Sequence, residues 1–148
     1  MSMEAYALCR RPLASVSEWQ AGLDALGFDL QLRSDKIPPA LSGHLPATRR
    51  GRKSGFECSV ISLSELRDFY PDIDFGGSWS CAYAFNFGTI SESIGALMGI
   101  AACVHVVGGL AYYPEDDRLL TADQAVQYAR DTVPGIEDLE EQLGGGTA

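Results

Sequence analysis

Five stretches of the chain have the apolar or alternating pattern of β-strands. They are AYALCRR, FDLQLR, GFECSVISL, WSCAYAFNF and LAYY, at residues 5–11, 28–33, 55–63, 79–87 and 110–113. The alternation is clearest in the fourth stretch, where aromatic side chains share one face and mostly small side chains occupy the other. A face of small residues leaves room for a helix, so we expect this strand to lie inside the sheet.

Helical periodicity and capping residues predict four helices, the last of them followed by one or two further helical turns. They cover residues 15–27, 64–70, 89–107, 121–133 and, after a proline, 134–143. The expected N-caps are Ser15 or Ser17, Ser64, Thr89 or Ser91, and Thr121.

The third helical segment is apolar almost all round, which predicts a helix buried on most sides. Gly95 and Gly99 leave one of its faces without side chains at two positions, so another element is expected to cross there closely. Its apolar run from Ile94 to Val107 has 14 residues. A bilayer span needs roughly 18 or more, so we expect a core helix and no membrane contact.

Residues 34–54 lose all periodicity and are rich in proline, glycine, serine and cations. We expect a long surface loop there, and long loops are often functional. The element order is then β-α-β-loop-β-α-β-α-β-α. This order predicts a single compact α+β domain over residues 1–143, with a mainly antiparallel sheet of about five strands and helices packed on one face. Residues 144–148 are expected to form a flexible tail.

Charge is divided unevenly along the chain, whose net charge is −9. Residues 1–53 hold eight Lys/Arg and five Asp/Glu, whereas residues 54–148 hold three and fifteen. An acidic surface accelerates encounters with a basic partner. The alternative is that the acidic half serves solubility alone.

The four cysteines lie far apart, and none forms a CxxC pair. Each has apolar or small neighbours, so they are expected to be buried thiols. The first residues, MSMEAYALCRRPL, lack the apolar core of a signal peptide. These features predict a protein of the reducing cytoplasm.

The basic cluster RRGRK has two interpretations. Arg49, Arg50, Arg52 and Lys53 have the charge to contact phosphates. However, no aromatic residues are interleaved with them, and an acidic chain repels a polyanion, so no nucleic-acid partner is expected. The favoured interpretation is the end of a solvated loop, and a second possibility is that the cluster pairs with the chain's own acidic half.

Catalytic and metal-binding patterns have little support. His44 lies in the loop and would need to reach Cys58 or Cys81 for cysteine catalysis, whereas His105 lies within the apolar helix and is expected to be a core residue. No metal-ligand spacing occurs, and no cofactor motif is present. The sequence therefore predicts no enzyme, no metal and no cofactor.

Two acidic loops carry aromatic residues and are the candidate partner-binding sites. Interfaces favour aromatic anchors at their centre and charges at their rim. One loop follows the helix at residues 64–70, and the other follows LAYY. The candidate residues are Asp72, Asp74, Trp79, Tyr113, Glu115, Asp116 and Asp117.

The layout of the chain resembles a group of small bacterial proteins. The resemblance rests on LDALGFDLQL, SGFECSVI, AYAFNF and GGLAYYPEDDRLLTADQAVQYAR, and it covers roughly residues 6–132. Several of these families look like immunity proteins of polymorphic toxin systems. The resemblance implies a cytoplasmic protein that neutralises one cognate toxin by binding it, and it assigns no role to any residue.

Three functions follow as expectations. The leading one is an immunity protein that occludes the active site of a basic toxin or effector through an acidic surface. The second is a small-molecule-binding domain or cryptic enzyme with a pocket under residues 34–54, near His44. The third is a subunit of an assembly whose acidic surface serves solubility.

Overall fold

The computed structural model describes residues 3–38, 40 and 43–144. Its strands are β1 (Met3–Cys9), β2 (Gln31–Leu32), β3 (Gly43–Arg49), β4 (Arg52–Ile61), β5 (Cys81–Phe87), β6 (Leu110–Tyr113) and β7 (Arg118–Thr121). Its helices are α1 (Val16–Ala25), α2 (Leu63–Phe69), α3 (Ile90–Val107), the short 3-10 turn η1 (Pro114–Asp116) and α4 (Ala122–Gly144). The fold is α+β, as the sequence predicts.

All described strands join one antiparallel sheet in the order β2-β3-β4-β5-β1-β6-β7. The antiparallel sense is confirmed, but the expected number of about five strands is wrong. The two additional strands are β3, which lies inside the supposed loop at 34–54, and β7, which forms a hairpin with β6. The strand expected at 28–33 is reduced to Gln31 and Leu32.

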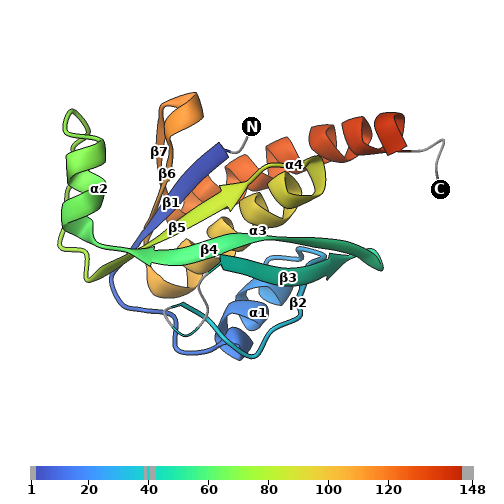
Figure 1. The fold of residues 1–148 in the computed structure, drawn as a ribbon, viewed down its shortest axis with the longest axis horizontal. Helices are drawn as coiled ribbons and strands as arrows, with labels where there is room; N and C mark the ends of the chain where they lie inside the picture. Colours follow the sequence, from blue (N-terminus) through green and yellow to red (C-terminus); the bar gives the residue numbers. More distant parts are fainter. Residues whose placement is uncertain (1–2, 39, 41–42, 145–148) are drawn as a thin grey trace.

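The sheet separates two apolar layers. One face packs against α1, α3 and α4 and forms the larger core; we call it the helix face. The opposite face, here the outer face, packs against α2 and the segment that follows it. The expectation that all helices lie on one face is therefore wrong for α2, which stands apart from the other three helices (Figure 1).

Strand β3 is hidden in the sequence because a cation and a proline interrupt its alternating pattern. Leu45, Ala47 and Arg49 alternate inward, and the third of these is a cation. Pro46 also argues against a strand, since it lacks an N–H. Its carbonyl accepts from Arg33, just beyond the end of β2, so its missing N–H faces a side where pairing stops. The β3–β4 ladder is thus complete.

The basic cluster forms the tip of the β3–β4 hairpin. Arg49 pairs with Arg52, and the two residues between them turn the chain. Arg50 and Gly51 both have positive φ, 54° and 74°, which is the geometry of tight hairpin turns. The cluster is therefore a hairpin turn between two strands, and its interpretation as the end of a loop is wrong.

Helix α3 is the centre of the larger core. Thr89 caps it, and Glu92 completes a capping box. A Cβ on Gly95 would lie 3.1 Å from the carbonyl oxygen of Gly55, and one on Gly99 would lie 2.8 Å from the Phe56 ring, so the expected close crossing is made by β4. The 18 residues of α3 are long and apolar enough for a membrane span, but 67% of them are buried in the fold, as in a core helix.

Helix α4 continues through Pro134, where the sequence predicts two segments. Pro134 has no N–H to donate to the carbonyl four residues earlier, and this usually weakens a helix. The second half of α4 is stabilised by β3, because Glu137 and Glu140 accept hydrogen bonds from Arg49. Gly144 ends α4, and the rest of the predicted tail, 145–148, lies outside the described residues.

The helix caps largely follow the sequence. Ser15 accepts from the Glu18 backbone, and Thr121 exchanges hydrogen bonds with Gln124. The exception is α2, which is capped by Ser62 instead of Ser64. The helix therefore begins two residues earlier than expected.

Candidate protein-binding surface

The outer face of the sheet is only partly covered. Helix α2 and the following segment cover Leu8, Ala82 and the rings of Tyr6 and Tyr112. Beyond them the outer-face side chains of β3, β4, β5 and the start of β1 are exposed or half-buried. A half-open antiparallel sheet is common, but its open side is then available to a partner.

A row of polar side chains crosses this open area. His44 pairs with Glu57, Glu57 with Asn86, and Asn86 with Glu4, across four neighbouring strands. Side chains directly opposite each other on one sheet face lie about 5 Å apart at their Cβ atoms. We call these four residues the cross-strand row. In this row the amide of Asn86 lies between the carboxylates of Glu57 and Glu4, one on each side.

A tyrosine cluster adjoins the row at Glu4. The hydroxyl of Tyr6 donates to Glu4 at 2.8 Å and lies 3.4 Å from the hydroxyl of Tyr70. The ring of Tyr112 stacks on Tyr6 at 6.4 Å between centroids and meets Tyr70 edge-on at 5.0 Å. The three rings hold the segment after α2 onto the sheet, with Phe75 edge-on to Tyr112 at 5.3 Å.

Tyr6 and Tyr112 stay protonated at neutral pH. Burial, followed by hydrogen bonds to Tyr70 and Glu4, raises the pKa of Tyr6 well above its ordinary value. Burial also raises the pKa of Tyr112, with the nearby Tyr70 and Asp117 adding to the effect. The hydroxyls therefore act as neutral donors, and the carboxylates supply the negative charge of this surface.

A hollow of about 180 Å³ lies beside Glu57 and Asn86 of the row, where β5 ends. It is lined by Glu57, Asn86, Phe87, Gly88 and Glu92. Two of these five residues are glutamates, although Glu92 also accepts from the backbone of Gly88 at 2.9 Å. Such a hollow has the charge to receive the end of a lysine or arginine side chain.

The first predicted loop borders the tyrosine cluster. Asp72 and Asp74 are exposed, and Asp74 accepts from the backbone of Gly76 at 2.9 Å. Trp79 is half-buried, donates to the carbonyl of Phe75 at 3.1 Å and lies under the guanidinium of Arg10. Trp79 is thus engaged in the fold near the start of β6 and does not project as an anchor.

The second predicted loop is divided between the two sides of the sheet. Glu115 is exposed, and Asp117 lies near Tyr112 at the edge of the tyrosine cluster. Asp116 instead accepts from Tyr128 of α4 at 2.5 Å, on the helix side. Tyr113 is buried on the helix face. Tyr112 joins the two loops through its contacts with Tyr70 and Phe75, while Asp116 and Tyr113 lie on the helix side, so the seven predicted residues form no single patch.

The residues that join these loops escaped the sequence analysis. Glu4, Tyr6 and Tyr70 were not among the predicted candidates, and Tyr113 was chosen where Tyr112 faces the cluster. The available signal is the alternation of Glu4, Tyr6 and Leu8 within MEAYALC, which places a carboxylate and a tyrosine on one face of a strand. That strand's neighbours depend on the sheet order, which the sequence does not reveal.

The three arginines of the basic cluster pair with two glutamates within the fold. Arg49 has 3% of its side-chain surface exposed and donates to Glu137 at 2.9 Å and to Glu140. Arg50 and Arg52 lie 3.2 and 4.0 Å from the same two carboxylates. The possibility that the cluster pairs with the chain's own acidic half is therefore confirmed for these three arginines.

Among the described residues, His44 is separated by the sheet from Cys58 and Cys81, so it cannot pair with either thiol for cysteine catalysis. His44 lies on the outer face, whereas Cys58 belongs to the core of the helix face and Cys81 packs against that core. Burial raises the pKa of Cys58, which keeps its thiol unreactive. His105 is exposed on α3, so its prediction as a core residue is wrong. Within the described ranges, no three metal-ligating side chains cluster together.

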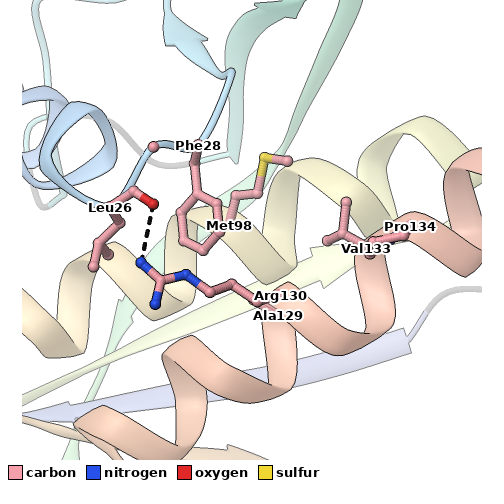
Figure 2. A pocket seen from close by; sticks show the side chains of 8 residues that line it. Leu26, Phe28, Met98, Ala129, Arg130, Val133 and Pro134 are labelled. Atoms are coloured by element: carbon pink, nitrogen blue, oxygen red, sulfur yellow. Dashed lines mark hydrogen bonds between the residues drawn. The ribbon is translucent and has the colours of Figure 1, made fainter.

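An apolar cavity of about 210 Å³ lies between α1, α3 and α4 (Figure 2). Phe28, Met98 and Val133 line it, and Arg130 stands beside it. The guanidinium of Arg130 donates to the carbonyl of Leu26 at 3.1 Å, so it caps the end of α1 (Figure 2). Neither this cavity nor the hollow beside Glu57 is lined by described residues of the segment 34–54, where the small-molecule interpretation expects its pocket.

Comparison with known proteins adds no relative to this description. No model of a known protein family matches the chain, and neither a curated protein nor a solved structure matches it. The residues of the outer face are interpreted from their own chemistry.

Proposed function

We propose that the chain is a non-enzymatic inhibitor of the immunity-protein kind, which binds a basic toxin or effector in the cytoplasm and occludes its active site. The observation that supports this proposal is the continuous polar surface on the open outer face. It consists of the cross-strand row, whose Glu4 end is held by a hydrogen bond from the buried Tyr6.

The chemistry of this surface suits a cationic partner. Glu4 and Glu57 are exposed carboxylates on rigid strands, and Asp74 and Asp117 border the tyrosine cluster. Proteins that act on anionic substrates carry basic clefts, and a fixed acidic face competes with the substrate for such a cleft. Tyr6 and Tyr112 are buried, so they support this surface from within: the Tyr6 hydroxyl fixes the carboxylate of Glu4, and the exposed carboxylates supply the contacts.

The experiment is co-expression of the chain with the product of each neighbouring gene, followed by growth assays and co-purification. A partner that is toxic alone, harmless with the chain and isolated with it in a stable complex is the expected result. Two variants then locate the surface. Glu4→Gln with Glu57→Gln removes both charges of the row, and we expect its Kd to rise at least about tenfold.

The matched control is Asp29→Asn with Asp35→Asn, which removes two exposed carboxylates elsewhere on the chain. We expect this variant to bind as tightly as the original protein. Equal binding by both double variants would contradict the outer face as the binding surface. The absence of a toxic, co-purifying partner, or turnover of a substrate by the purified chain, would contradict the inhibitor function itself.

A further inference from the structure

A second cavity lies on the helix side of the sheet, between the ends of β1, β5 and β6 and helices α3 and α4. Its volume is about 150 Å³. Met3, Phe87, Leu97 and Ile136 supply apolar walls. A dry apolar cavity of about this volume accommodates a molecule as large as benzene.

One polar group in the wall of this cavity has no partner. Tyr113 lines the cavity, and its hydroxyl is buried without a hydrogen-bond partner among the described residues. Burial raises the pKa of Tyr113 far above its ordinary value, so the hydroxyl remains a donor at neutral pH. A buried donor without an acceptor is costly, and buried polar groups are almost always paired.

The charges around the cavity select against an anion. Asp116 also lines the cavity, where its carboxylate accepts from the hydroxyl of Tyr128. The guanidinium of Arg118 lies 5.2 Å from the ring of Tyr128. The carboxylate of Asp116 already has its donor, and it would repel a second negative charge beside Tyr113.

We propose that this cavity binds a small neutral organic molecule, with an apolar body of about six to eight non-hydrogen atoms and one oxygen that accepts a hydrogen bond from Tyr113. The apolar walls hold the body, and the oxygen supplies the acceptor that the hydroxyl lacks. The site lies on the opposite side of the sheet from the outer face, so it does not depend on the proposed inhibitor function. If the chain binds a small molecule, the hydroxyl of Tyr113 in this cavity is the group that would recognise it.

The test compares cyclohexanone with toluene, a ring of the same number of non-hydrogen atoms without the oxygen. Titration followed by amide NMR should shift the resonances of residues lining the cavity with both probes. In Tyr113→Phe, we expect cyclohexanone to bind about five- to tenfold more weakly, and toluene to bind within about twofold of its original affinity. The comparison across variants cancels the different hydrophobicities of the two probes.

Two further measurements keep the test decisive. The melting temperature of ligand-free Tyr113→Phe should equal or exceed that of the original protein, because the lost hydroxyl makes no hydrogen bond; a fall of several degrees would overturn the proposal. Ser93→Leu, which fills the cavity from α3, should abolish binding of both probes. Unchanged binding to Ser93→Leu, an equal effect of Tyr113→Phe on both probes, or no shift at the lining residues would likewise refute it.

Discussion

The guanidinium of Arg49 on β3 lies 2.9 Å from a carboxylate oxygen of Glu137 on α4, although the two residues are 88 positions apart. Glu140 accepts from the same guanidinium one helical turn later. The contact fixes the tip of the β3–β4 hairpin against the second half of α4. It thus joins the basic and the acidic halves of the chain through a nearly buried cation.

Loss of this cation should destabilise the fold. Arg49→Met keeps an apolar stem but leaves Glu137 and Glu140 without their buried partner. We expect the free energy of unfolding to fall by about 2–4 kcal/mol, measured by urea denaturation. Arg52→Gln is the control, because Arg52 is exposed and its loss should cost less than about 1 kcal/mol. Equal losses in the two variants would show that burial of Arg49 adds nothing.

Two glycine substitutions in helices should have opposite effects. A Cβ on Gly99 would lie 2.8 Å from the ring of Phe56, which is fully buried against Trp19 and Phe85. Gly99→Ala should therefore destabilise the protein by about 1–3 kcal/mol, despite the better helix propensity of alanine. A Cβ on Gly135 meets nothing within 4 Å, so Gly135→Ala should stabilise by about 0.5–1 kcal/mol. Thermal and urea unfolding measure the stability of both variants. Stabilisation by Gly99→Ala would contradict the packing at Gly99.

Tyr128 should make stability depend on alkaline pH. Burial and the hydrogen bond to Asp116 raise the pKa of Tyr128 from 10.0 to about 12. The folded protein therefore holds this proton more tightly than the unfolded chain. The resulting stabilisation is complete below about pH 10 and is lost as the pH rises through about 12. Tyr128→Phe should flatten the fall of the unfolding free energy over this range.

Asp116→Asn serves as the companion variant for Tyr128. It removes the carboxylate but keeps Tyr128 buried, so we expect a pH dependence between those of the original protein and Tyr128→Phe. Urea denaturation at several pH values, with tyrosinate absorbance recorded in parallel, gives both quantities. An unchanged alkaline slope in Tyr128→Phe would assign the effect to other tyrosines.

Association with a basic partner should depend on salt if the outer face binds it. We expect the association rate to fall about tenfold as salt rises from about 0.05 to 0.5 M, because charges on the face steer the encounter. The variant Glu4→Gln with Glu57→Gln should associate more slowly and with a shallower salt dependence. Stopped-flow mixing measures the rate, and a rate that salt does not change would rule out electrostatic steering.

Local signals in the sequence predicted much of the fold. The N-cap at Thr89, one of two candidates, the two glycines of α3 and the alternation of β5 each depend on residues close in the chain, and each is confirmed. Strand β3 was missed because its inward cation is stabilised by a helix far along the sequence. The continuity of α4 through Pro134 was missed for the same reason, since its second half is held by that cation.

The candidate site was predictable only in part. Asp72, Asp74 and Asp117 are exposed acidic residues, as a reading of acidic loops suggests. The cross-strand row and the tyrosine cluster instead arise from register, because β1 lies between β5 and β6. A sequence shows which residues share a strand face, but the strands that flank it are chosen by the packing of the whole sheet.

The interior place of β1 has a consequence for how the chain is made. Its two neighbours, β5 and β6, begin at Cys81 and Leu110, so ribosomal synthesis delivers β1 long before either edge can be paired. At about 5–20 residues per second, this delay lasts roughly 5–20 s. Strands β2 to β5 are sequential neighbours and can assemble meanwhile. The nascent chain thus carries an apolar strand with two open edges, which are templates for unwanted pairing until β5 and β6 emerge.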